Sequence, residues 1–122
     1  MSHFADKAVL VTGAAGCIGA WVVKLLRDMG AMPVVYDLVD NRERLHLIMD
    51  GANDIAWELG DITDFERLVQ VAQQHSVTAI IHLAALQVPF CKADPVSSTR
   101  INVMGSINIL ELARQRGIDC LS

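Results

Sequence analysis

The chain has 122 residues, of which 52% are apolar and 20% charged, and a formal net charge of −4. This length accommodates one domain or part of one, and the high apolar content excludes a disordered chain. The longest apolar run, about ten residues at 77–86, is too short to span a membrane, and the scattered basic residues exclude an electrostatic footprint for nucleic acid.

The first third of the chain predicts a strand, a helix and a second strand. Residues 7–12 form an apolar run that ends at Gly13, which is typical of a strand buried on both faces. Apolar residues at helical spacing follow over 21–29, and Gly30 stands where a helix C-cap glycine belongs. Residues 33–37 then predict the second strand.

The middle of the chain predicts a short helix, a strand and a longer helix. Residues 42–49 indicate a weak, short helix, and 54–58 a third strand. An amphipathic helix is predicted over 65–75, with either Thr63 or Asp64 as its N-cap.

The last third predicts a strand, a long helix and the start of another strand. Residues 78–82 form the fourth strand. Asp94 followed by Pro95 is a typical helix start, and that helix is expected to end near Gly117. Residues 118–121 indicate the opening of a fifth strand. Strands that alternate with helices predict βαβ units, and therefore an α/β fold with a parallel sheet and right-handed crossovers.

A glycine-rich segment lies between the first strand and the first helix, where residues 12–19 read TGAAGCIG. A diphosphate bound at a helix N-terminus needs exposed backbone N–H groups and no Cβ in the way. Gly13 suits the tight turn, Gly16 the approach of a pyrophosphate, and Gly19 close packing of the helix on the strand. The alternative is that the three glycines only form a tight turn; the strand–turn–helix context favours dinucleotide binding.

An aspartate at the end of the second strand adds a second signal. Asp37 lies 18 residues after Gly19, where a dinucleotide site places a carboxylate to accept hydrogen bonds from the adenosine ribose. The alternative is a solvent-facing turn aspartate. A carboxylate there would repel a 2′-phosphate, although Arg42 and Arg44 lie close enough in sequence to counter part of that repulsion. NAD is therefore the expected cofactor and NADP the less favoured one.

Four spaced motifs resemble those of the extended short-chain dehydrogenases/reductases, the NAD-dependent epimerase/dehydratase family that includes nucleotide-sugar epimerases. Residues 12–19 are similar to its TGxxGxxG, 60–64 (GDITD) to GDxxD, 82–85 (HLAA) to HxAA, and 102–111 (NVMGSINILE) to NVxGTxNLLE. The resemblance spans nearly the whole chain. It implies an incomplete Rossmann-type doubly wound parallel sheet of about four to five strands in the order 3-2-1-4-5.

The same resemblance implies a set of cofactor contacts. In the family the first aspartate of GDxxD contacts the adenine, HxAA runs under the cofactor, and the asparagine of NVxG lies near the nicotinamide end. The cofactor-binding residues expected here are Gly13, Gly16, Cys17, Ile18, Gly19, Asp37, Leu38, Asp61, Ile62, Leu83, Ala84, Ala85, Gln87 and Asn102.

Some of these residues also have plainer interpretations. Asp61 can be a loop residue before a helix cap, and Asn102 an exposed helical amide. His82 is expected to be a packed or hydrogen-bonded strand-end histidine rather than a catalytic base, and no residue stands at metal-ligand spacing from it. Cys17 is interpreted as a backbone contact at the helix N-terminus rather than a redox centre.

The catalytic pair of the family has no counterpart in this chain. Hydride transfer there rests on a Tyr-x-x-x-Lys pair, in which the tyrosine is the general acid/base. The one tyrosine, Tyr36, is followed four residues later by Asp40. We therefore expect no catalytic residue here, a single dinucleotide-binding domain over 1–122 that stops before the catalytic and substrate segments, and little activity of the chain alone.

Two functional hypotheses follow. The first is the NAD-binding portion of an epimerase/dehydratase-type oxidoreductase that acts by hydride transfer, on a nucleotide sugar or related hydroxy compound as the resemblance implies. The second is a non-catalytic dinucleotide-sensing or scaffold module that regulates a partner. The fourth strand lies near an open sheet edge, which predicts self-association or a partner chain. Three cysteines at unrelated spacings and no apolar leader favour a cytoplasmic setting.

Overall fold

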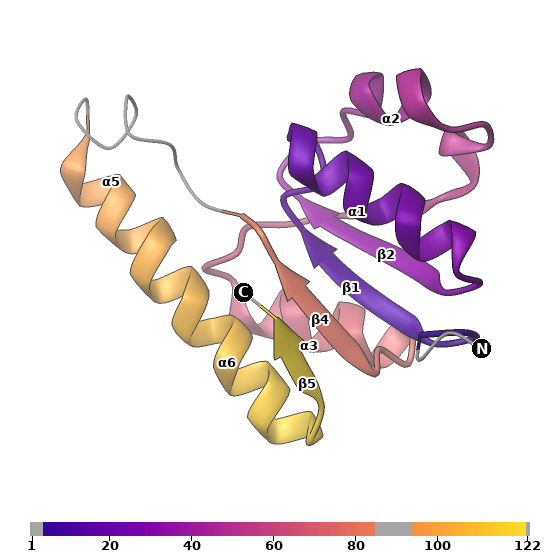
Figure 1. Cartoon of the computed structure of the whole chain (residues 1–122). Helices are drawn as coiled ribbons and strands as arrows, with labels where there is room; N and C mark the ends of the chain where they lie inside the picture. The colour runs from indigo at the N-terminus through magenta and orange to yellow at the C-terminus, as the bar shows by residue number, and fades with distance from the viewer. Residues whose placement is uncertain (1–3, 85–93, 122) are drawn as a thin grey trace.

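Five parallel strands form one sheet in the computed structural model, which describes residues 4–84 and 94–121 (Figure 1). The strand order is β3-β2-β1-β4-β5, which confirms the predicted doubly wound topology. The strands are β1 (Ala8–Thr12), β2 (Met32–Asp37), β3 (Ala56–Leu59), β4 (Ala79–His82) and β5 (Asp119–Leu121). β1 occupies the centre, and the chain passes from β3 back across it to β4.

Helices cover both faces of this sheet. α1 and α2 pack on one face, and α3 and α6 pack on the other. The helical segments are α1 (Cys17–Asp28), α2 (Glu43–Ile48), the 3₁₀ turn η1 (Ala52–Asp54), α3 (Phe65–Gln74), α5 (Pro95–Thr99), the π-helical turn η2 (Arg100–Met104) and α6 (Gly105–Arg116). Within the described residues, none of the helices is both long and apolar enough to cross a membrane.

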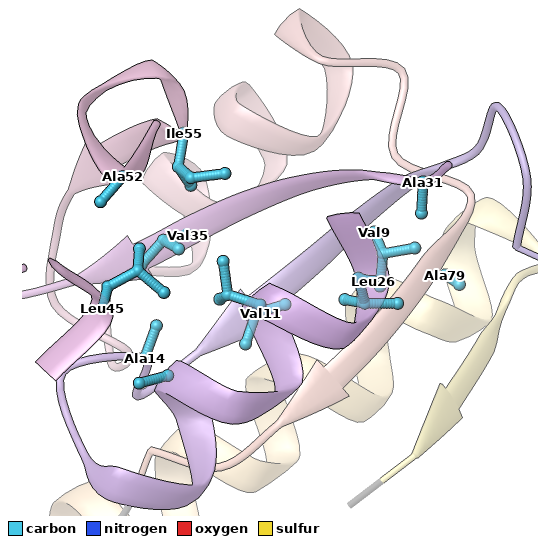
Figure 2. Close-up of a cluster of buried hydrophobic side chains, with 12 residues drawn as sticks. Val9, Val11, Ala14, Leu26, Ala31, Val35, Leu45, Ala52, Ile55 and Ala79 are labelled. Carbon is cyan, nitrogen blue, oxygen red and sulfur yellow. The ribbon is translucent and has the colours of Figure 1, made fainter. Parts of the chain in front are cut away.

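The central strands supply a hydrophobic core on each face. All five residues of β1 are buried, as its uninterrupted apolar run predicts. Because successive strand side chains point to opposite faces, Val9 and Val11 pack under α1, whereas Leu10 packs under α3 and α6. Figure 2 shows the first core, in which Val9, Val11 and Val35 of the sheet face Leu26 of α1 and Leu45 of α2.

The helix ends follow local signals that were only partly predicted. Asp64, rather than Thr63, caps α3 by accepting a hydrogen bond from the Arg67 N–H at 3.1 Å. Gly117 ends α6 in the left-handed region at φ +65°. α1 begins directly after Gly16, earlier than the apolar spacing predicts, because its first turn is small or exposed and carries no apolar periodicity.

The long C-terminal helix differs from the uninterrupted one that was predicted. α5 and α6 run in one line along the edge of the sheet (Figure 1), but a π-helical turn, η2, separates them. β3 also begins at Ala56 rather than at residue 54, because Ala52–Asp54 forms the 3₁₀ turn η1. Neither irregularity has a signal in the apolar pattern.

The second core predicts a large difference between two leucines of α6. Leu112 is fully buried against the sheet and Leu110 is 60% exposed. Leu112→Ala should lower the free energy of unfolding by about 2–5 kcal/mol, because it leaves a cavity. The control Leu110→Ala should change it by less than about 0.5 kcal/mol. Urea unfolding followed by circular dichroism measures both, and equal losses would contradict this packing.

Candidate functional site

A cleft of about 330 Å³ opens at the carboxyl ends of β1, β2 and β4. This is where the chain reverses direction across the sheet, the place where open α/β sheets bind ligands. Most of the residues that line it come from loops that follow these strands and β3. They are Gly13, Gly16, Tyr36, Asp37, Leu38, Gly60, Asp61, Ile62, Leu83, Ala84 and Ile101.

Gly13 sets the position of the glycine loop against β4. Its backbone adopts φ +81°, a conformation that side-chain-bearing residues rarely adopt. A Cβ on Gly13 would lie 2.8 Å from the backbone nitrogen of Ala84 and 2.9 Å from the carbonyl carbon of Leu83. The loop therefore contacts the segment after β4 through backbone alone.

The other two glycines of the motif have different surroundings. A Cβ on Gly16 would have only the Gly13 carbonyl oxygen nearby, at 3.7 Å, so this residue borders open space in the cleft. Gly19 is buried, and a Cβ there would lie 2.6 Å from Cα of Ala14. Cys17 and Ile18 lie exposed in the first turn of α1, outside the lining of the cleft.

Asp37 connects the end of β2 to the glycine loop. Its Oδ1 accepts a hydrogen bond from Leu38 N–H at 2.8 Å, and its Oδ2 accepts one from Ala15 N–H at 3.4 Å. The carboxylate is half-buried and lines the cleft beside Gly16. Leu38 follows it with an exposed side chain that also lines the cleft.

Asp61 and Tyr36 form the adjacent wall. The Asp61 carboxylate accepts hydrogen bonds from Thr63 N–H at 2.8 Å and Thr63 Oγ1 at 2.7 Å, which hold its pKa below its usual range. The Tyr36 hydroxyl donates to the Asp61 carbonyl at 2.7 Å. Burial, with a smaller contribution from the charge of Asp64, raises the pKa of Tyr36 to about 12. A Cβ on Gly60 would lie 2.6 Å from the Tyr36 ring.

His82, Leu83 and Ala84 meet the end of β1 at Thr12. Leu83 N–H and Ala84 N–H donate to Thr12 Oγ1 at 3.0 and 3.1 Å, and His82 Nδ1 lies 2.7 Å from the same oxygen. Leu83 and Ala84 line the cleft, whereas His82 lies behind it, 7% exposed. Burial lowers the pKa of His82.

The remaining predicted residues lie less directly at the cleft. Asn102 belongs to η2, and its Nδ2 donates to Ser98 Oγ at 3.4 Å; its neighbour Ile101 lines the cleft instead. Ile62 lines the cleft and packs on Gly105, where a Cβ would lie 2.7 Å from its Cγ2 atom. Ala85 and Gln87 fall outside the described residues.

Four residues at this site were missed from the sequence. Tyr36, Gly60 and Ile101 line the cleft, and Thr12 ties β1 to the segment after β4. Thr12 and Gly60 open two of the quoted motifs, so their place in the motif was the available signal. Tyr36 precedes Asp37 at a strand end. In the described ranges 4–84 and 94–121, no three His, Cys, Asp or Glu side chains gather as a metal site.

Comparison with known proteins places this cleft in context. The family model described as GDP-mannose 4,6 dehydratase matches residues 10–120. A UDP-glucose 4-epimerase of Rhizobium leguminosarum bv. trifolii is 38% identical over 116 residues, which are 94% of this chain and 34% of that protein. The chain thus spans about a third of the length of such relatives.

Two solved structures match with the same coverage. The UDP-glucose 4-epimerase of Thermus thermophilus, in complex with NAD, has a TM-score of 0.77 and 31% identity over 92% of this chain and 35% of its own. The L-threonine dehydrogenase of Clostridium difficile has a TM-score of 0.76 and 28% identity over 95% of this chain and 35% of its own.

The glycine loop yields a matched pair of substitutions. Gly13 and Gly30 have nearly the same φ, +81° and +83°, but a Cβ on Gly30 would meet nothing within 4 Å. Gly30→Ala should lower the free energy of unfolding by about 1–2 kcal/mol, the cost of the left-handed conformation. Gly13→Ala should cost a further ~1–3 kcal/mol, because the backbone at Ala84 must shift. Equal losses in urea unfolding would show that the loop does not contact Ala84.

Proposed function

We propose, because the chain belongs to the extended short-chain dehydrogenase/reductase family of NAD-dependent epimerases and dehydratases, that it forms the NAD-binding portion of an oxidoreductase. The enzyme would transfer hydride between the nicotinamide and a carbinol carbon of a nucleotide sugar or a related hydroxy compound. One observation carries the proposal: the cleft at the strand ends is lined by Gly13, Gly16, Asp37 and Asp61 together.

The described residues fit a dinucleotide. Gly16 borders open space directly before α1, so a diphosphate can approach the backbone and the positive end of the helix dipole there. Asp37 offers carboxylate oxygens to ribose hydroxyls, and Asp61 lies where the family binds adenine. Leu83 and Ala84 provide a small, apolar wall for the other half of the cofactor.

The surroundings of Arg42 support NAD rather than NADP. Arg42 Nε donates to Asp40 Oδ1 at 2.6 Å, and its Nη1 donates to the carbonyls of Ala52 and Ile55 at 2.8 and 3.0 Å. Its guanidinium also lies 4.9 Å from the Trp57 ring centroid. Because these contacts occupy the guanidinium, Asp37 stands without its help against a 2′-phosphate.

Bound nicotinamide supplies the hydride acceptor and donor, and this chain supplies binding and orientation. Tyr36 does not replace the tyrosine of a Tyr-x-x-x-Lys pair, because it is 1% exposed and its hydroxyl is donated to the Asp61 carbonyl. With its pKa raised to about 12, it holds its proton at neutral pH. We therefore propose that these 122 residues bind the cofactor without turning over substrate.

A non-catalytic dinucleotide-sensing module is the second candidate. The separation of functions in this sequence favours it: the residues that line the cofactor cleft are present, and the Tyr-x-x-x-Lys pair is not. Restoration of hydride transfer on mixing with a polypeptide that carries this pair would favour the enzyme, whereas a change in a partner's activity on NAD binding would favour the module.

The proposed partner surface lies at the β5 side of the sheet. β5 has three residues, and on α6 and the turn before it Val103, Ile107 and Leu110 are about half exposed at spacings of four and three. These residues share one helix face. We propose that this face and the β5 edge pair with a second copy or with a partner chain.

Self-association through this face predicts a concentration-dependent mass in sedimentation. Ile107→Lys should shift the purified chain toward monomer, because it places a charge in the apolar face. Leu25→Lys is the matched control, since Leu25 is equally exposed but lies on α1, over the opposite face of the sheet. A wild-type chain that stays monomeric at high concentration would contradict self-association.

Calorimetric titration tests the cofactor proposal directly. The wild-type chain should bind NAD saturably and more tightly than NADP. Asp37→Ala should weaken NAD binding about ten- to a hundredfold, the usual worth of hydrogen bonds to a charged group. Asp37→Asn retains an acceptor for Leu38 N–H and separates charge from loop support. Asp50→Ala, an exposed carboxylate outside the cleft, is the control. A folded chain that binds neither nucleotide would contradict the proposal.

A further inference from the structure

A row of polar side chains lies behind the cleft at the strand ends. The register pairs Thr12 of β1 with Tyr36 of β2 on one side and with His82 of β4 on the other. All three are buried, and their side chains point to the face covered by α3 and α6. Tyr36 reaches the Asp61 carbonyl, whereas Thr12 and His82 bond to each other.

The hydrogen bonds at Thr12 fix the direction of the bond to His82. Thr12 Oγ1 already accepts from two backbone donors, Leu83 N–H and Ala84 N–H. Its own proton therefore goes to the third neighbour, His82 Nδ1, at 2.7 Å. Nδ1 is an acceptor in this arrangement, so the proton of the neutral imidazole is on Nε2.

The other side of the ring continues the same direction. His82 Nε2 lies 3.4 Å from Ser106 Oγ, and the Ser106 hydroxyl donates to the Asn102 carbonyl at 2.7 Å. Nε2–H therefore donates to an oxygen whose own proton is already used. Thr12, His82 and Ser106 form a one-way chain of hydrogen bonds from the β1–β4 junction to η2.

This chain ends at an irregular helical turn that borders the cleft. π-Helical turns are rare and often occur at functional sites. η2 contains both Asn102, which accepts from Ser106, and Ile101, which lines the cleft. At its other end, Thr12 precedes Gly13 and holds the backbone of Leu83 and Ala84. The hydrogen bonds thus connect the glycine loop with the opposite wall of the cleft.

We propose that His82, as the neutral Nε2–H imidazole, is a positioning residue that holds the two walls of the cofactor cleft at their working separation. It acts through Thr12 and Ser106 and does not line the cleft itself. This inference rests on the proposed function, because the cleft has a working geometry only if it binds the dinucleotide.

Protonation of His82 breaks the chain. Imidazolium would present Nδ1–H to Thr12 Oγ1, which already accepts two hydrogen bonds, and the Thr12 hydroxyl would lose its acceptor. β1 carries no charged residue, Arg100 of η2 acts on Asp61, and Glu111 of α6 is paired with Arg114. Burial is the cause of the lowered pKa of His82, so the neutral form prevails at pH 7.

The sign of the pH dependence follows. The intact cleft disfavours the proton, so NAD affinity should be full above about pH 6.5, the ordinary pKa of histidine, and should fall as the pH drops below it. For each unit by which the pKa is lowered, the dissociation constant should rise at most about tenfold between pH 7.5 and pH 5. Titrating carboxylates contribute also, so a variant must isolate the histidine.

Two substitutions separate positioning from bulk packing. In His82→Asn the amide oxygen can accept from Thr12 as Nδ1 does, and the side chain does not titrate; its NAD affinity should stay near wild type at pH 7.5 and lose the histidine-dependent part of the fall at lower pH. His82→Leu removes the acceptor and should weaken NAD binding at every pH. Urea unfolding of each variant, at both pH values, verifies that it is folded. A wild-type pH profile identical to that of His82→Asn would overturn the inference.

The tautomer provides a readout that needs no cofactor and no variant. Long-range ¹H–¹⁵N correlation spectra of the wild-type chain at pH 7.5 should show the His82 ring protonated on Nε2 and bare on Nδ1. A ring protonated on Nδ1, in a chain that binds NAD, would overturn the inference and leave the proposed function intact. An Nε2–H ring in a folded chain that binds no NAD would overturn the proposed function, and the positioning role with it.

Discussion

The closest constraint in the molecule is the contact between the backbone of Gly13 and the backbone that follows β4. No side chain fits between them, and three hydrogen bonds from Leu83 N–H and Ala84 N–H to Thr12 hold the same junction. Because β1 is the central strand, this junction fixes where the glycine loop begins and how α1 points. The cleft exists because the loop on one side and Leu83 and Ala84 on the other cannot move apart independently.

Much of this arrangement was predictable because it depends on local chain chemistry. Parallel strands buried on both faces appear as apolar runs, and the residue that ends each run must lie at the same edge of the sheet. Gly13, Asp37, Asp61 and Ala84 each follow such a run, and the structure brings them to one cleft. Strand order needed the resemblance to a family, since alternation alone does not say on which side of β1 the fourth strand pairs.

The features that sequence reasoning missed depend on register and on helix geometry. The pairing of Thr12 with His82 joins residues 70 positions apart, and nothing in either local pattern announces it. The π-helical turn changes which residue of 101–102 borders the cleft, so Ile101 lies where a regular helix would have favoured another assignment. Tyr36 was interpreted only as a missing catalyst, although its hydroxyl supports the loop that carries Asp61.

The contacts of Arg42 have a consequence for how such a domain can diverge. The guanidinium links the turn after β2 to the carbonyls around η1 and covers Trp57, whose Nε1–H in turn donates to the Val39 carbonyl. A lineage that recruited this arginine to a phosphorylated ribose would loosen its own β2–β3 connection in the same step. A change of cofactor is therefore more accessible through a new cation at the exposed position 38, paired with loss of the carboxylate at 37, than through the arginine already present.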